Sequence, residues 1–233
     1  RCVLWLEFRR VLFRSLITYD EKTKIVEKPN FTPTGEVIYY KASKVTDNGV
    51  SSEKNGAIYL VDKDGKESTI VENGEDPMIS KDGKSLVYES EGKIYIQTIA
   101  NKTSKYVANG KYPAFSNDGN LISYIKEETE IQSPDVSTAR KASIEKATST
   151  LCVLNLATEK SQSITDNGVD IKDNQSWSGA IRELVYTGDL DVTSKYSYYE
   201  SIWSLDNKEV YVIRRNNEDE KQVYELINFK LDN

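Results

Sequence analysis

The chain has 233 residues, of which 38% are hydrophobic and 29% are charged, and its formal net charge is −6. This length fits one all-β domain, and the acidic balance argues against a protein that binds a nucleic-acid backbone, which needs a basic patch or stripe. Histidine is absent, so histidine-dependent nucleophilic sites and histidine-bound zinc are excluded within these residues.

Residues 1–15 have a sequence that we do not expect in the native protein. Residues 7–15 back-translate in frame to the end of a common sequencing-library adapter. A basic and apolar export signal is the alternative, but Glu7, Arg9, Arg10 and Arg14 interrupt its apolar run. We therefore predict that residues 1–15 are an adapter artefact and that residues 16–233 are one domain, present as a fragment. Residues 16–233 hold 27 basic and 36 acidic side chains, a net charge of −9.

The first predicted unit of strands and turns covers residues 31–71. Residues 31–40 contain a turn at Gly35 and then an apolar strand, and a second strand at 57–61 turns at 62–65 into 68–71. The acidic turn at 62–67 has some likeness to a calcium loop. An EF-hand needs twelve residues and flanking helices, so we predict a plain hairpin turn. Residues 41–56 are expected to be a long insertion.

Residues 71–88 and 107–124 repeat one pattern at an offset of 36 residues, with eight of the eighteen positions identical. Each copy has an Asn-Gly pair, a proline, a Ser-x-Asp-Gly turn and an apolar strand. Asparagine and glycine tolerate positive φ, and Asp-Gly is a strong hairpin signal. Further strands at 93–97 and 104–107 make four antiparallel strands in one unit. Self-similarity at this spacing is typical of repeat folds such as propellers.

The chain after Tyr124 follows the pattern less regularly. A second insertion is expected at 126–149, where Ser133-Pro134 predicts the start of a short helix. A strand follows at 151–156, then a long interblade link at 165–176. Residues 177–186 and 203–212 echo the strand-turn-strand pattern, but they are 26 residues apart, too close for two complete units. The acidic turn at 188–191 is predicted to be a plain turn.

The motifs at 113–119 and 58–62 resemble the TolB-like, WD-type propeller repeat of bacteria. That repeat has Pro-x-aromatic-Ser-Pro-Asp-Gly-Lys, an apolar strand and then Ile-Tyr-x-x-Asp; here Asn117 replaces a proline. The resemblance implies an all-β β-propeller of four-stranded antiparallel blades, and it suggests a periplasmic or extracellular location. At about 40–45 residues per blade, we expect about five blades in an incomplete six-bladed ring.

No motif predicts a catalytic residue, a metal ligand or a cofactor, and the binding residues are unknown from the sequence. There is no Gly-x-Ser-x-Gly nucleophile motif and no phosphate-binding glycine loop. Cys152 lies in an apolar strand, which favours a buried core residue over a nucleophile. Tyr196, Tyr198 and Tyr199 fall outside the repeat and fit either a contact surface or an outer strand.

Insertions at 41–56 and 126–149 and the link at 165–176 are expected on one face of the propeller, because connections between successive strands alternate between its faces. Repeat proteins often bind through such a face. We therefore predict a non-catalytic recognition or scaffold propeller that binds a protein, peptide or envelope component there. The alternative is the N-terminal gating propeller of a prolyl-oligopeptidase-type serine peptidase whose catalytic domain is missing. A third option, a carboxylate-using glycosidase, needs an acidic cluster at the central channel.

Overall fold

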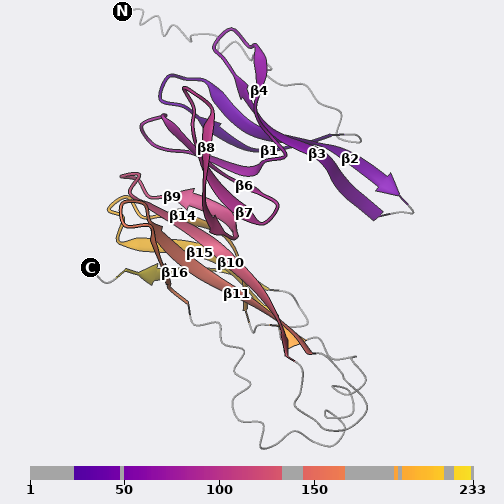
Figure 1. The fold of residues 1–233 in the computed structure, drawn as a ribbon, viewed down its shortest axis with the longest axis vertical. Helices are drawn as coiled ribbons and strands as arrows, with labels where there is room; N and C mark the ends of the chain where they lie inside the picture. The colour runs from indigo at the N-terminus through magenta and orange to yellow at the C-terminus, as the bar shows by residue number, and fades with distance from the viewer. Residues whose placement is uncertain are drawn as a thin grey trace, which may run out of the picture.

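A computed structural model describes residues 24–47, 50–132, 144–165, 192–193, 196–217 and 223–231 (Figure 1). Sixteen strands and no helix are present in these ranges. The predicted artefact at 1–15, the predicted helix start at Ser133-Pro134, the strand-turn-strand at 177–186 and the acidic turn at 188–191 all lie outside the described residues.

Four antiparallel sheets follow one another along the chain and confirm the predicted propeller architecture. Blade 1 comprises β1 (Lys24–Phe31), β2 (Val37–Asp47), β3 (Val50–Val61) and β4 (Glu67–Glu72). Blade 2 comprises β5 (Glu75–Ile79), β6 (Ser85–Ser90), β7 (Lys93–Thr98) and β8 (Thr103–Asn109). Blade 3 comprises β9 (Lys111–Phe115), β10 (Leu121–Gln132), β11 (Ile144–Asn155) and β12 (Lys160–Ser163), with β13 (Val192–Thr193) parallel to β11. Blade 4 comprises β14 (Tyr196–Trp203), β15 (Glu209–Asn216) and β16 (Tyr224–Lys230). The described residues thus form four blades rather than about five.

The predicted Ser-x-Asp turn joins the first and second strands of three blades with the same hydrogen bonds. In blade 3, the Ser116 hydroxyl donates to Asp118 Oδ1 at 2.6 Å and accepts from the Leu121 amide at 2.9 Å. The turns at Ser80 and Ser204 repeat both bonds at the same distances. The repeated sequence motif therefore encodes one turn geometry.

Blade 4 builds this turn without glycine. Gly119 has a φ of +74° in blade 3, and Asn207 occupies the matching position in blade 4 with a φ of +59°. Asparagine is among the few non-glycine residues that adopt this conformation readily. The prediction of a strand-turn-strand at 203–212 is confirmed, since β14 ends at Trp203 and β15 begins at Glu209.

In blades 2 to 4, the inner strand carries a large apolar residue at its end that packs against the preceding blade. Ile79, Phe115 and Trp203 are 9%, 4% and 9% exposed, and each lies in a core cluster with residues of the blade before it. Phe31 has the same position in blade 1 and is 73% exposed. The described residues therefore leave this face of blade 1 uncovered, as expected for an incomplete ring.

Asn117, which departs from the family repeat, connects the turns of blades 3 and 4. Its backbone amide donates to Asn207 Oδ1 at 2.7 Å, and its side-chain amide donates to the Ser204 carbonyl at 2.8 Å. A proline at this position would lack both donors. In blade 1, Pro33 does occupy this position, and it lies against Gly83 of blade 2. In blades 1 and 3 this turn position thus contacts a residue of the next blade, by packing at Pro33 and by hydrogen bonding at Asn117.

Replacing Asn117 by proline is expected to lower the free energy of unfolding by about 2 kcal/mol, because it removes two partly buried hydrogen-bond donors and leaves acceptors behind. Asn117→Ala keeps the backbone donor, so about 1 kcal/mol is expected. Urea denaturation measures both. Lys81→Ala, at the matching exposed position of blade 2, is the control and should change stability by less than about 0.5 kcal/mol. Equal losses for all three variants would contradict this role of Asn117.

The segments expected to be insertions are long antiparallel hairpins where the structure describes them. The β10–β11 ladder runs from the pair Leu121–Asn155 to the pair Gln132–Ile144, and β2 and β3 pair as far as Asp47 and Val50. Both hairpins extend toward the same side of the molecule (Figure 1). Ile144, which falls in the segment predicted to contain a short helix, begins strand β11.

Two residues that sequence analysis singled out belong to the core. Cys152 is 2% exposed, and burial raises the pKa of its thiol, which confirms the core interpretation. Tyr198 is 4% exposed and lies on β14, the inner strand of blade 4 rather than an outer one. Its neighbour Tyr199 is partly buried, with its ring centroid 6.3 Å from that of Tyr112.

Candidate functional site

The inner strands of all four blades carry a β-bulge at equivalent places. In blades 1 to 3 the bulge contains a non-glycine residue with positive φ, followed by a proline: Lys28 at +55°, Asp76 at +49° and Tyr112 at +52°. Such residues are uncommon and strained, and they cluster at functional sites. Bulges also redirect side chains out of the regular alternation of a strand. The repeated bulge therefore marks this level of the propeller as a candidate site.

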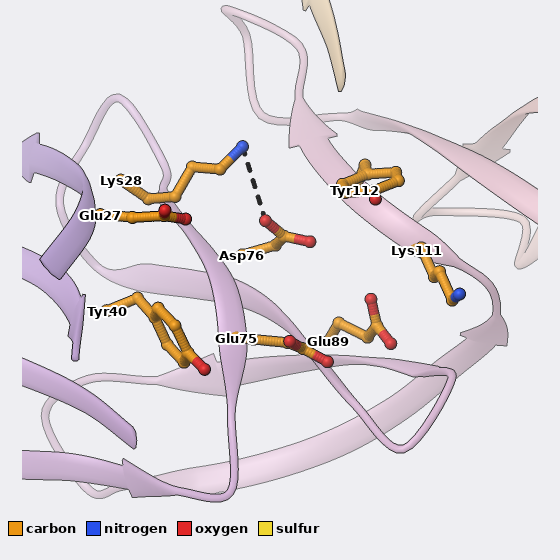
Figure 2. A pocket seen from close by; sticks show the side chains of 8 residues that line it. All are labelled: Glu27, Lys28, Tyr40, Glu75, Asp76, Glu89, Lys111 and Tyr112. Carbon is orange, nitrogen blue, oxygen red and sulfur yellow. Dashed lines mark ion pairs between the residues drawn. The ribbon is translucent and has the colours of Figure 1, made fainter. Parts of the chain in front are cut away.

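The bulges gather eight side chains around one pocket of about 230 Å³ (Figure 2). Three inner strands each contribute two consecutive residues, namely Glu27 and Lys28 from β1, Glu75 and Asp76 from β5, and Lys111 and Tyr112 from β9. The second strands of blades 1 and 2 contribute Tyr40 and Glu89, which are the cross-strand partners of Glu27 and Glu75. The three inner strands thus contribute residues from equivalent positions of the repeat, and the residue types at these positions differ between blades.

Both lysines of the pocket form ion pairs with carboxylates. The Lys28 ammonium lies 3.5 Å from Asp76 and also pairs with Glu200 of β14, so it joins three blades. The Lys111 ammonium lies 2.8 Å from Glu127 of β10, and this pairing raises the pKa of Lys111. Burial raises the pKa of Asp76, and the nearby Lys28 opposes that rise. Two of the carboxylates that engage these lysines, Glu127 and Glu200, do not line the pocket.

Glu89 is the most deeply buried carboxyl group of the pocket, with 4% of the residue exposed. Its Oε1 accepts a hydrogen bond from the Gly92 amide at 3.1 Å, and its Oε2 has no hydrogen bond or ion pair with a described residue. Burial, followed by repulsion from Glu75 and Asp76, raises the pKa of Glu89 to about 7. Glu89 therefore exchanges a proton near neutral pH.

The pocket has more negative groups than positive ones. Four carboxyl groups and two lysines line it, and Glu27, Glu75 and Glu89 form no ion pair with any residue in the described ranges. Glu27 and Glu75 are exposed to solvent, whereas Glu89 is buried. Because both lysines are already paired, this acidic lining favours a positively charged group in the pocket.

A second cavity of about 200 Å³ adjoins the first. It shares Lys28, Asp76 and Tyr112 with the first pocket and adds residues of β14, including Glu200 and Ser201. All four inner strands therefore meet here, which places the candidate site at the centre of the blades rather than on an outer strand.

Sequence analysis identified none of these site residues. One signal was available: each proline of a repeat is preceded by two polar or aromatic residues, as in Glu27-Lys28-Pro29, Glu75-Asp76-Pro77 and Lys111-Tyr112-Pro113. A second signal was Glu89, which ends the buried run of β6. The acidic turn at 62–67 has no ligand geometry: Asp62 Oδ1 accepts from the Asp64 and Lys66 amides at 3.0 and 2.8 Å, which confirms the hairpin turn.

The described ranges lack two other kinds of feature. No group of three or more Cys, Asp or Glu side chains there is placed to hold a metal ion. Within the same ranges, no helix is long and apolar enough to cross a membrane.

Comparison with known proteins supports the fold. No protein-family model and no curated protein matches the chain. The chain is similar to the structure of TolB from Acinetobacter baumannii, with a TM-score of 0.53 and 16% identity over 88% of this chain and 41% of that one. It is also similar to acylaminoacyl peptidase from Pyrococcus horikoshii, with a TM-score of 0.53 and 13% identity over 92% of this chain and 32% of that one. The chain thus spans less than half of each of these proteins, and its resemblance to TolB-like propellers is confirmed at the level of the fold.

Proposed function

We propose that this chain is a non-catalytic recognition propeller that binds a protein or peptide through the face bearing the β2–β3 and β10–β11 hairpins. The observation that carries this proposal is the length of these hairpins on one side of the molecule (Figure 1). Strands β10 and β11 have 12 residues each, whereas β6 and β7 of blade 2 have 6. We take the extra length of these hairpins to be the contact surface for the partner.

The position of the central pocket also supports binding through the face that bears the two hairpins. In an antiparallel blade, the inner strand begins at the edge where the hairpin between the second and third strands turns. Glu75 and Lys111 are the first residues of β5 and β9, so the pocket lies toward the hairpin side. The ion pair between Lys111 and Glu127 also connects the pocket to the base of the β10–β11 hairpin. A partner held between the hairpins would therefore reach the pocket.

Selection of peptides from a displayed library on the immobilised chain tests this proposal. Peptides are expected to be enriched, and their binding should be lost when residues 129–147 are replaced by an Asn-Gly turn that joins the paired residues Glu128 and Thr148 in a short hairpin. Lys81→Glu, in the β5–β6 turn on the opposite face, is the control and should leave binding unchanged. Enrichment that survives the shortened hairpin but is lost in the Lys81 variant would reject the hairpin face.

The alternative is the gating propeller of a prolyl-oligopeptidase-type serine peptidase. The similarity to acylaminoacyl peptidase from Pyrococcus horikoshii over 92% of this chain favours it. Sequencing of the source DNA beyond codon 233 separates the two proposals. A continuing frame with Gly-x-Ser-x-Gly followed by Asp and His would support the peptidase, and a stop codon would support the recognition propeller.

The acidic residues at the axis also meet one requirement of the glycosidase interpretation. A glycosidase needs two carboxyl groups that flank a sugar. Here Asp76 is paired with Lys28 at 3.5 Å, and the remaining carboxylates share the pocket with a second lysine, Lys111. The arrangement therefore fits recognition of a charged group better than hydrolysis of a sugar.

A further inference from the structure

We propose that the pocket between β1, β5 and β9 binds a primary ammonium group, presented by a lysine side chain of the partner. This inference rests on the proposed function and adds the chemistry by which that partner is recognised. The charge and the volume of the pocket both limit what it accepts.

The buried carboxyl of Glu89 is the first argument. The residue is 4% exposed, and its Oε2 has no hydrogen bond or ion pair with any residue in the described ranges. Figure 2 shows this carboxyl directed into the pocket, in the space between Asp76 and Lys111. This oxygen is not a fully buried atom without a partner, so it is accessible from the cavity. A donor supplied from outside the chain can therefore pair with it.

The charges around the pocket define the sign of this donor. Glu75 is the cross-strand partner of Glu89, and Glu27 lines the same pocket from blade 1. Both are exposed residues that have no ion pair with a described residue. Lys28 and Lys111 are held by Asp76 and Glu127 at 3.5 and 2.8 Å. An anion would meet three carboxylates with no uncommitted lysine, whereas a cation would meet three carboxylates without a partner. The pocket therefore selects a cation.

The arrangement of the carboxylates favours ammonium over guanidinium. Glu27, Glu75 and Glu89 come from three different strands, β1, β5 and β6, so they approach the cavity from different directions. A guanidinium is planar and best suited to one bidentate carboxylate, but Glu89 Oε1 already accepts from the Gly92 amide, which leaves one oxygen. A lysine ammonium is a compact point charge that pairs with a single carboxylate oxygen. Tyr40 and Tyr112 supply the aromatic wall along which an alkyl chain packs.

The size of the pocket favours a side chain over a whole metabolite. Its volume of about 230 Å³ is below the range of roughly 300–1,000 Å³ that is typical for small-molecule pockets. A single side chain anchored in the pocket leaves the rest of a peptide on the hairpin face. In protein interfaces, a few buried anchor residues commonly supply most of the binding energy, and the surrounding contacts exclude water.

Binding of an ammonium group should depend on the ionisation of Glu89. The groups that face Glu89 are Glu75 and Asp76 on β5, Lys111 and Tyr112 on β9, and Glu27, Lys28 and Tyr40 of blade 1. Of these, Glu75 and Asp76 raise the pKa of Glu89 and Lys111 lowers it, and the pKa is about 7. Ionised Glu89 attracts the ammonium and protonated Glu89 does not, so binding should strengthen as the pH rises through about 7.

Titration of the ¹⁵N-labelled chain with acetyl-Gly-Gly-Lys-Gly-Gly-amide tests the proposal. We expect shifts at the amides of Gly92, which bonds Glu89, and of Tyr112, and no shifts with the matched norleucine peptide. The affinity should be about tenfold higher at pH 8 than at pH 6, following the ionised fraction of a group with a pKa of about 7. In Glu89→Gln, binding should be weak and independent of pH, and the amide spectrum reports whether the variant is folded.

Three outcomes would overturn the proposal. These are equal shifts with the lysine and norleucine peptides, wild-type binding that does not change between pH 6 and pH 8, or binding of n-butylammonium without binding of the lysine peptide. The last result would point to a free amine as the ligand. The experiments distinguish failure of the recognition propeller from failure of the ammonium pocket. Library selection can yield peptides whose binding depends on the hairpin but does not need a lysine. That result would keep the recognition propeller and reject the ammonium pocket.

Discussion

Replacing Gly110 by alanine is expected to lower the free energy of unfolding by about 3 kcal/mol or more. Gly110 links blades 2 and 3, is buried, and has a φ of +153°. A Cβ atom there would lie 2.5 Å from the carbonyl oxygen of Ile125 and 2.6 Å from Cδ2 of Tyr124. A backbone carbonyl in the middle of a sheet has no rotation that relieves such a clash, so the strands themselves must shift. Urea denaturation measures the loss.

Two glycine controls separate the clash from the backbone conformation. Gly119→Ala changes a glycine with a φ of +74° and nothing within 4 Å of the new Cβ, so about 1 kcal/mol is expected from the conformation alone. Gly74→Ala, at the matching repeat position, would meet Val71 and Ile58 side chains at 2.7 and 3.0 Å. Side chains can move, so an intermediate loss of about 1–2 kcal/mol is expected. Equal losses at Gly110 and Gly119 would show that the carbonyl contact has no effect.

The turns of this fold are predictable from the sequence because a few residues determine each one. The Ser-x-Asp turn closes on itself through the serine hydroxyl and the aspartate, with no help from distant residues. Its three copies therefore form wherever the motif occurs, including blade 4, where Asn207 replaces glycine. The motif does not determine what its second residue contacts. At Asn117, the hydrogen-bond partners of that residue come from the next blade.

The extended hairpins were less predictable, because their sequences resemble those of loops. Residues 126–132 include Lys126, Glu127, Glu128 and Glu130, a composition that is as typical of a loop as of a strand. The alternation of apolar and polar residues that reveals a half-buried strand is missing there. Pairing with 144–150 instead continues the ladder that the buried residues of β10 and β11 begin.

The candidate site could not be predicted from the sequence, because its residues occupy equivalent positions in the repeat but differ in residue type. The three bulges present Glu27-Lys28, Glu75-Asp76 and Lys111-Tyr112, and no motif search unites a lysine, an aspartate and a tyrosine. Only the packing of the inner strands around one axis brings these residues together. Repeat alignment identifies the position, and the three-dimensional arrangement is needed to show that this position faces a pocket.

Replacing Glu89 by glutamine is expected to stabilise the protein at pH 8 relative to the wild type and to lose this advantage at pH 5. The pKa of Glu89 is raised from 4.5 to about 7 in the folded state. Protonated Glu89 therefore stabilises the fold, a contribution that is fully present below about pH 4.5 and is lost as the pH rises through about 7. Glutamine keeps an acceptor for the Gly92 amide but does not titrate. The difference in unfolding free energy between variant and wild type should change by about 2–3 kcal/mol from pH 5 to pH 8.

Urea denaturation at pH 5, 6, 7 and 8 measures this change, and Glu72→Gln serves as the matched control. Glu72 is exposed on β4, so its variant should follow the wild type at every pH. The steepest divergence of Glu89→Gln should fall between pH 5 and pH 7, because only there does the folded state bind a proton that the unfolded state has released. Parallel curves for Glu89→Gln and the wild type would show that burial and the neighbouring carboxylates do not hold a proton on Glu89. The pH dependence expected for the ammonium pocket would then lose its physical basis, since it depends on the same ionisation.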